Sequence, residues 1–167
     1  MRSFLVILII CIAAAGIGGG LYLYGPASFH VSLLSNSPYV KFTPIVAGDR
    51  AAQVNERTNY RVQNADQLAA LWELVYGVEA PTPPKVNFEK SEVLAVFDGS
   101  HSTSGYKVQV QNITDTGGKR MVTILRTVPG DSCKPSQDSS SPFIIVQVPK
   151  TPLALGHTEQ SATTTCI

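Results

Sequence analysis

The pattern of apolar and polar residues predicts a mostly β domain with one helix. From Glu92 to Phe97 nearly every position is apolar, which is typical of a strand buried on both faces. The residues from Gly99 to Gly105 are of turn-forming types. Tyr106, Val108 and Val110 then alternate with polar residues, as in a half-exposed strand. We therefore expect a central strand, a polar turn and a second strand here.

One soluble helix is predicted, from Asn64 to Tyr76. Asn64 is a suitable N-cap, Gln67 completes a capping-box-like pattern, and Gly77 is a natural residue just beyond the C-terminus. Apolar residues recur at helical spacing and define one face: Leu68, Leu71, Trp72 and Val75. This face predicts that the helix packs on a sheet.

Three further segments are predicted as strands, at residues 40–46, 120–128 and 143–148. Residues 53–62 alternate loosely and are expected to form one strand or a broken pair of strands. The turn Asp115–Gly118 joins the strand after Tyr106 to the strand at 120–128, which predicts a hairpin. The fold class expected is α+β. It is a mostly antiparallel β-sheet or small sandwich with one packed helix, preceded by an N-terminal transmembrane helix.

Residues 3–24 form an uncharged, mostly apolar stretch, and about 20 such residues cross a bilayer. Arg2 precedes it, so the positive-inside rule places the N-terminus in the cytoplasm and the rest of the chain outside. The alternative is a secreted protein, since Ala13-Ala14-Ala15 offers a signal-peptide cleavage site. Both the uncleaved anchor and the cleaved signal peptide would place the β-rich domain outside the cytoplasm.

The chain divides into a membrane anchor (1–25), a juxtamembrane spacer (26–39), a β-rich domain (40–151) and a C-terminal tail (152–167). From Lys41 onward acidic and basic residues are interspersed, with no run of Lys or Arg. Nucleic acid is therefore not an expected partner.

Two cysteines, Cys133 and Cys166, lie in the exported part of the chain. A pair of cysteines in an oxidising compartment suggests one disulfide. Such a bridge would tie down the Thr-rich C-terminal tail.

Two groups of residues have the residue types of catalytic motifs, but their expected local structure does not place the side chains for catalysis. Asp98, Ser100 and His101 contain triad residue types, yet neighbours on a turn are expected to point apart, so we expect His101 to be a solvated turn residue. Ser104 and Lys107 match S-x-x-K, which requires a helix, whereas this segment enters a strand. No histidine or cysteine pair has metal-ligand spacing. We expect no enzyme, no metal and no cofactor.

A series of short motifs resembles the C-terminal domain of PrcB, a subunit of a bacterial surface protease complex. In order, the motifs are Arg61-Val62, Leu71-Trp72, residues 86–90 (VNFEK), residues 93–97 (VLAVF), residues 103–106 (TSGY), Pro129-Gly130 with Cys133, Gln137, residues 141–143 (SPF) and residues 148–150 (VPK). The family pattern has T-G-G-Y where this chain has T-S-G-Y, and its cysteine normally lies closer to the Pro-Gly pair.

The resemblance implies a small exported domain that binds and stabilises a protein partner, an exported protease in the named case. It carries over no catalytic residues. The positions that it defines, as structural or contact residues, are Thr103, Ser104, Gly105, Tyr106, Gln137 and Pro142. The expected function is a membrane-anchored, extracytoplasmic, non-catalytic protein-binding domain, with Gly99–Gly105 and Pro129–Ser141 as candidate contact segments. The alternative is a tethered small-ligand-binding or sensor domain of the cell envelope.

Overall fold

The computed structural model describes residues 39–166. Its elements, in chain order, are β1 (Thr43–Gly48), β2 (Thr58–Val62), α3 (Ala65–Tyr76), the 3-10 turn η1 (Gly77–Glu79), β3 (Ser91–Phe97), β4 (Lys107–Thr116), β5 (Lys119–Pro129), β6 (Phe143–Pro149) and β7 (Ala154–Thr164). The predicted anchor and nearly all of the predicted spacer lie outside the described residues. Within the described residues, no helix has the length and apolar character needed to cross a bilayer.

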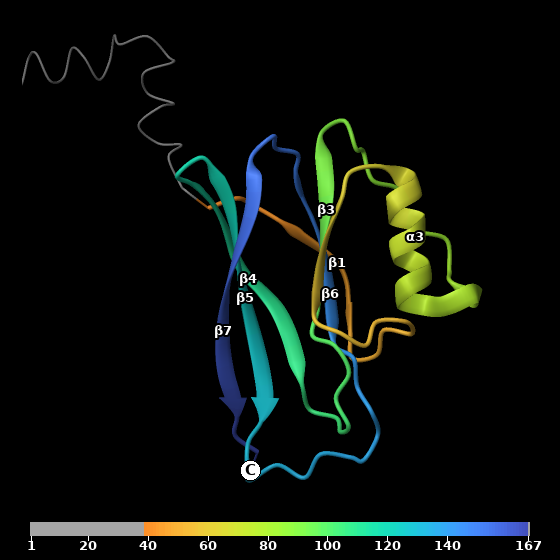
Figure 1. The fold of residues 1–167 in the computed structure, drawn as a ribbon, viewed down its shortest axis with the longest axis vertical. Helices are drawn as coiled ribbons and strands as arrows, with labels where there is room; N and C mark the ends of the chain where they lie inside the picture. Colours follow the sequence, from red (N-terminus) through yellow and green to blue (C-terminus); the bar gives the residue numbers. More distant parts are fainter. Residues whose placement is uncertain (1–38, 167) are drawn as a thin grey trace, which may run out of the picture. The chain divides into compact units, whose positions relative to one another are not determined.

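The strands form two sheets, and the helix adds a third layer (Figure 1). One sheet has four strands in the order β1-β6-β3-β2, and the other has three in the order β4-β5-β7. Helix α3 covers one face of the four-stranded sheet, and the three-stranded sheet lies on its other face. The expected α+β class, mostly β with one packed helix, is confirmed for the described residues.

Strand β3 is central, as its sequence predicts. It pairs antiparallel with β2 on one side and with β6 on the other. Its alternate side chains enter two separate cores: Val93, Ala95 and Phe97 pack toward α3, while Leu94 and Val96 pack toward the three-stranded sheet. A strand between two apolar layers needs apolar residues on both faces, which explains its continuous apolar sequence.

The helix begins and packs as predicted. The Asn64 side chain accepts a hydrogen bond from the backbone N–H of Gln67 at 2.9 Å. The Gln67 side chain accepts one from the N–H of Gln63 at 2.7 Å, one residue before the N-cap. All four predicted face residues are buried. Gly77, with φ of 77° and ψ of −160°, ends the helix in a backbone conformation that is open mainly to glycine.

The hairpin of β4 and β5 is confirmed, with Gly117 and Gly118 between the strands at φ of 57° and 74°. These two positive φ angles are those of a type I′ turn, whose twist matches that of the flanking strands. Residues 53–62, expected to be one strand or a broken pair, contain a single strand, β2, at Thr58–Val62.

The expected C-terminal tail is corrected by β7, which runs from Ala154 to Thr164 inside the domain. After β6 the chain crosses to the other sheet and pairs with β5 in parallel, a departure from the expected antiparallel pattern. Most β7 side chains are exposed because the strand lies at a sheet edge. Its sequence therefore lacks the apolar alternation that identifies a strand.

Candidate interaction surface

Two loops meet at one end of the sandwich. The short loop, residues 98–106, joins β3 to β4, and the long loop, residues 130–142, joins β5 to β6. The backbones of His101 and Ser140 exchange hydrogen bonds of 2.8 and 3.0 Å. The Ser136 N–H donates to the Ser104 hydroxyl at 2.9 Å, and the Ser140 hydroxyl donates to the Thr103 carbonyl at 2.7 Å. These bonds join the loops into one surface.

A disulfide between Cys133 and Cys166 fastens the long loop to the end of β7, which confirms the predicted pairing. The Gly130 N–H donates to the Thr164 carbonyl at 3.1 Å, and the Cys166 N–H donates to the Ser132 hydroxyl at 3.2 Å. The bridge thus closes a region that is already hydrogen-bonded.

A charged cluster lies beneath the two loops, centred on the buried carboxylate of Asp98. Arg126 donates to one of its oxygens, Arg57 lies 3.3 Å from that same oxygen, and His101 Nε2 lies 2.8 Å from the other. Arg126 also donates to Glu159 of β7 at 2.9 Å. A buried carboxylate is stable only when charges and donors compensate its lost hydration, and three partners do so here.

The pKa values of the cluster reflect this pairing. Burial alone lowers the pKa of Arg126, but the hydrogen bond to Glu159 and the charge of Asp98 outweigh burial, so the pKa lies above its ordinary value. The hydrogen bond from Arg126 lowers the pKa of Glu159. Both groups therefore stay charged at neutral pH. Their ion pairs link Asp98, which directly follows β3, to Arg126 of β5 and Glu159 of β7.

The structure corrects the expectation that His101 is a solvated turn residue. Its ring stacks on Tyr106 with centroids 3.7 Å apart, and its side chain is bonded to Asp98. Asp98 and His101 thus point toward each other rather than apart. The Ser100 hydroxyl instead donates to Asn55 at 3.2 Å. The three residue types of a triad are close together, but the hydroxyl is not presented to the imidazole.

Most residues that the family resemblance singles out make structural contacts in this surface. Gly105 has φ of 97°, and a Cβ there would lie 3.2 Å from Pro129. Pro142 is fully buried, and its carbonyl accepts the Asp98 N–H at 2.9 Å. Thr103, Ser104 and Tyr106 make the contacts given above. Gln137 is exposed on the long loop, which makes it accessible to a partner.

A second charged cluster, at the opposite ends of these strands, was not foreseen from the sequence. Glu92 is fully buried, and Arg61 donates to it at 2.9 Å. Arg120 lies 3.7 Å from Glu92 and makes two hydrogen bonds of 2.8 Å to Asp115. Glu92 is the residue in the sequence that could have indicated this cluster, because a carboxylate beside a run of apolar strand residues requires a cationic partner.

Three cavities lined by described residues have volumes of about 160, 270 and 240 Å³, whereas sites for small organic ligands usually measure ~300–1,000 Å³. Among residues 39–166, no group of three His, Cys, Asp or Glu side chains is placed to hold a metal ion.

The family model described as PrcB C-terminal matches residues 93–149, roughly a third of the chain. The matched segment runs from β3 through β6 and contains both loops and the cysteine of the long loop. The resemblance seen in the sequence is therefore confirmed over this segment. No curated protein and no solved structure matches the chain.

Proposed function

We propose that the chain is a membrane-anchored, extracytoplasmic protein-binding domain without catalytic activity, which acts as an accessory or stabilising subunit of an exported protease complex. The observation that carries the proposal is the match of residues 93–149 to the PrcB C-terminal family. That segment contains both loops of the surface, where we propose that the partner binds.

Three features support binding over catalysis. The short and long loops present exposed polar groups on a rigid base of strands, an arrangement that suits recognition. The Asp98 carboxylate and the His101 ring are committed to each other and to their neighbours. Within the described residues, the Ser104 and Ser136 hydroxyls pair with each other at 3.0 Å rather than with a base.

The sensor alternative is less well supported. A small-ligand site needs an apolar cavity of several hundred Å³, and the cavities given above are smaller. The disulfide favours the exported location, since bridges persist in oxidising compartments. The uncharged segment 3–24 is proposed as the anchor, with the N-terminus in the cytoplasm and the β domain outside.

Site-specific photo-crosslinking tests the proposal in the native membrane. A benzoylphenylalanine is placed at Gln137 on the long loop, and in a matched control at Lys119, an exposed position at the hairpin tip. We expect the Gln137 probe to capture one discrete protein that the Lys119 probe does not capture. Identical products from both probes, or no product in repeated experiments, would count against a protein-binding role for the loops.

A further inference from the structure

Strand β2 leaves a sheet edge open. Among residues 39–166, it is the last strand of the four-stranded sheet, and β3 is its one neighbour there. Its five residue pairs with β3 run without a shift. The opposite edge, β1, carries Pro44 and a register shift between Pro44 and Val46, both of which hinder pairing with a further strand. The β2 edge has neither protection.

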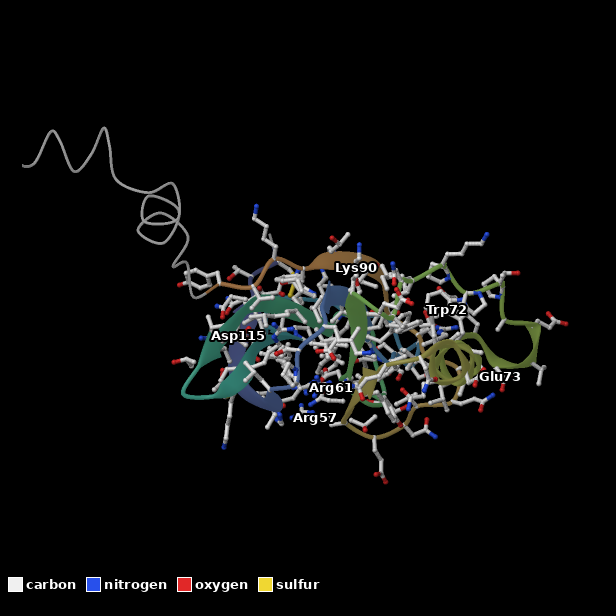
Figure 2. The ribbon with its side chains drawn as sticks, turned by 90° about the horizontal axis from the view of Figure 1, so that it is seen from above. Arg57, Arg61, Trp72, Glu73, Lys90 and Asp115 are labelled. Atoms are coloured by element: carbon white, nitrogen blue, oxygen red, sulfur yellow. A yellow bond between two sulfur atoms is a disulfide. The ribbon has the colours of Figure 1, made fainter. Side chains whose placement is uncertain are left out.

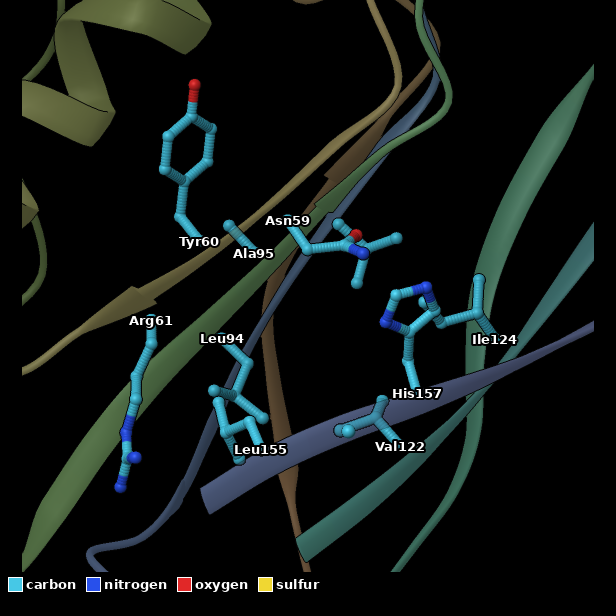
Figure 3. Close-up of a pocket in the computed structure, with 11 residues that line it drawn as sticks. Asn59, Tyr60, Arg61, Leu94, Ala95, Val122, Ile124, Leu155 and His157 are labelled. Carbon is cyan, nitrogen blue, oxygen red and sulfur yellow. The ribbon is translucent and has the colours of Figure 1, made fainter.

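A cavity flanks β2 on the side of the three-stranded sheet. Its volume is about 160 Å³, and its wall includes Leu94, Val122 and Leu155. Figure 3 shows Asn59 on the side of β2 that faces His157 of β7, while Tyr60 points the other way, toward the helix. The cavity thus lies in the seam between the edges of the two sheets.

A second cavity, of about 270 Å³, flanks β2 on the helix side and is lined by Ala70, Leu71 and Leu74 of α3. Tyr60 and Arg61 of β2 line both cavities. Successive side chains of a strand point to opposite faces of its sheet. A strand added beside β2 would therefore direct consecutive side chains alternately toward the two cavities.

An exposed arginine, Arg57, immediately precedes β2, two residues before Asn59, which lines the first cavity. Arg61 also lines this cavity, but its guanidinium is bonded to Glu92 and to the carbonyls of Thr151 and Leu153. The Arg57 side chain is 57% exposed, and its ion pair with Asp98 engages Nε at 3.3 Å. Seen from above, Arg57 and Arg61 lie on one side of the molecule and Lys90 on the other (Figure 2). A carboxylate on the added strand, two residues from the apolar side chain in this cavity, would lie near the Arg57 guanidinium.

We propose that the β2 edge binds an extended segment of a partner protein by strand addition. Two consecutive apolar residues of that segment fill the two cavities, and an acidic residue on the same face as the first pairs with Arg57. Backbone hydrogen bonds supply affinity, and the two cavities and the arginine supply selectivity. The inference deepens the proposed function, because it names the chemistry of a protein partner at a surface separate from the two loops.

The probe is a synthetic peptide, Thr-Asp-Thr-Val-Leu-Asp-Thr, blocked at both ends. Valine and leucine are adjacent, so they project to opposite faces, and an aspartate lies two residues from the valine in either direction. The control peptide, Thr-Asp-Val-Thr-Leu-Asp-Thr, has the same composition but places both apolar residues on one face. Binding of fluorescent derivatives to the full-length protein in non-ionic detergent is measured by anisotropy. Hydrogen exchange of residues 58–62 reports the location.

Two pairs of variants test the site. Ala70→Trp fills the helix-side cavity and Asn59→Trp blocks the mouth of the other, both at exposed positions. Ala69→Trp, at an exposed helix position that is not among the residues lining the cavity, and Gln160→Trp, on the β7 edge, are the matched controls. We expect the first pair to weaken binding by about tenfold or more and the controls to leave it within about twofold. Circular dichroism of each variant establishes that it is folded.

The peptide Thr-Asp-Thr-Val-Leu-Asp-Thr is expected to bind more tightly than the control peptide and to protect the amides of residues 58–62 from hydrogen exchange. Equal binding of the two peptides overturns the proposal, as does no saturable binding up to about 1 mM. Loss of binding in Gln160→Trp with retention in Ala70→Trp also overturns it, because the β7 edge would then be the site. The peptide assay contains no natural partner, so its failure is distinguishable from failure of the photo-crosslinking experiment.

Discussion

Replacing both bridge cysteines, in the double variant Cys133→Ser/Cys166→Ser, separates two roles of the disulfide. The bridge connects the long loop to the end of β7. β7 is also held by its pairing with β5 along its whole length and by the hydrogen bond from Arg126 to Glu159. We therefore expect β7 to stay in place without the bridge, and the stability loss to arise mainly in the unfolded chain.

The magnitude follows from the length of the closed loop. The cysteines are 33 residues apart, for which the loop-entropy relation gives about 12 cal/mol/K, or ~3.7 kcal/mol at room temperature. Typical domains of this size have a stability of ~5–15 kcal/mol, so the variant is expected to fold but with a much smaller reserve. With a urea slope of about 2 kcal/mol/M, the midpoint falls by roughly 2 M.

The assay is urea unfolding of a chain that begins at residue 39, followed by circular dichroism, with hydrogen exchange of β7 in parallel. The wild-type chain in excess reductant is the control and should match the double variant. A stability loss below about 1 kcal/mol would refute the entropic reasoning. Rapid exchange across β7 in an otherwise protected domain would show instead that the bridge holds the strand in the native state.

Two further predictions concern packing and pH. Trp72→Ala should lower the free energy of unfolding by about 3–5 kcal/mol, because the side chain is buried in the core beneath α3. Trp72→Phe should lower the free energy of unfolding less than Trp72→Ala does, because it keeps much of the ring volume and removes an indole N–H that lacks a partner. Equal losses for the two variants in urea unfolding would contradict this. For Glu159, the lowered pKa means that its stabilising effect is fully present above the unfolded value of 4.5 and is lost as pH falls through the folded pKa. Glu159→Gln should therefore be less stable than the wild type at neutral pH, with a difference that shrinks below about pH 4.5. A pH-independent difference in urea midpoints would show that the ion pair with Arg126 does not act this way.

Several elements were predictable because their signals are local. The Asn64 side chain caps the first turn of a helix whose apolar spacing is already visible in the sequence. The Gly117-Gly118 pair supplies the two positive φ angles that the hairpin requires. The continuous apolar run of β3 indicates burial on both faces, and the structure places the strand between two cores. The cysteine pair followed from composition and compartment.

Other features depend on contacts between distant segments. Whether Asp98 and His101 face each other is decided by the pairing of the short loop with the long loop, which brings Ser140 beside His101. The partners of Glu92 come from β2 and β5, whose positions relative to β3 have no local signature. His101 was predicted to be solvated because the loop conformation that turns its ring toward Asp98 and Tyr106 depends on the hydrogen bonds to Ser140 in the long loop.

The sequence by itself determined which strands are buried, where the helix begins and which turn closes the hairpin. Only the tertiary structure decided that residues 154–164 form β7, parallel to β5 at the edge of the second sheet. The physical reason is that burial leaves an apolar pattern in the sequence, whereas an edge strand is held by backbone hydrogen bonds that almost any side chain permits. The proposed strand addition at the β2 edge would use the same kind of backbone hydrogen bonds.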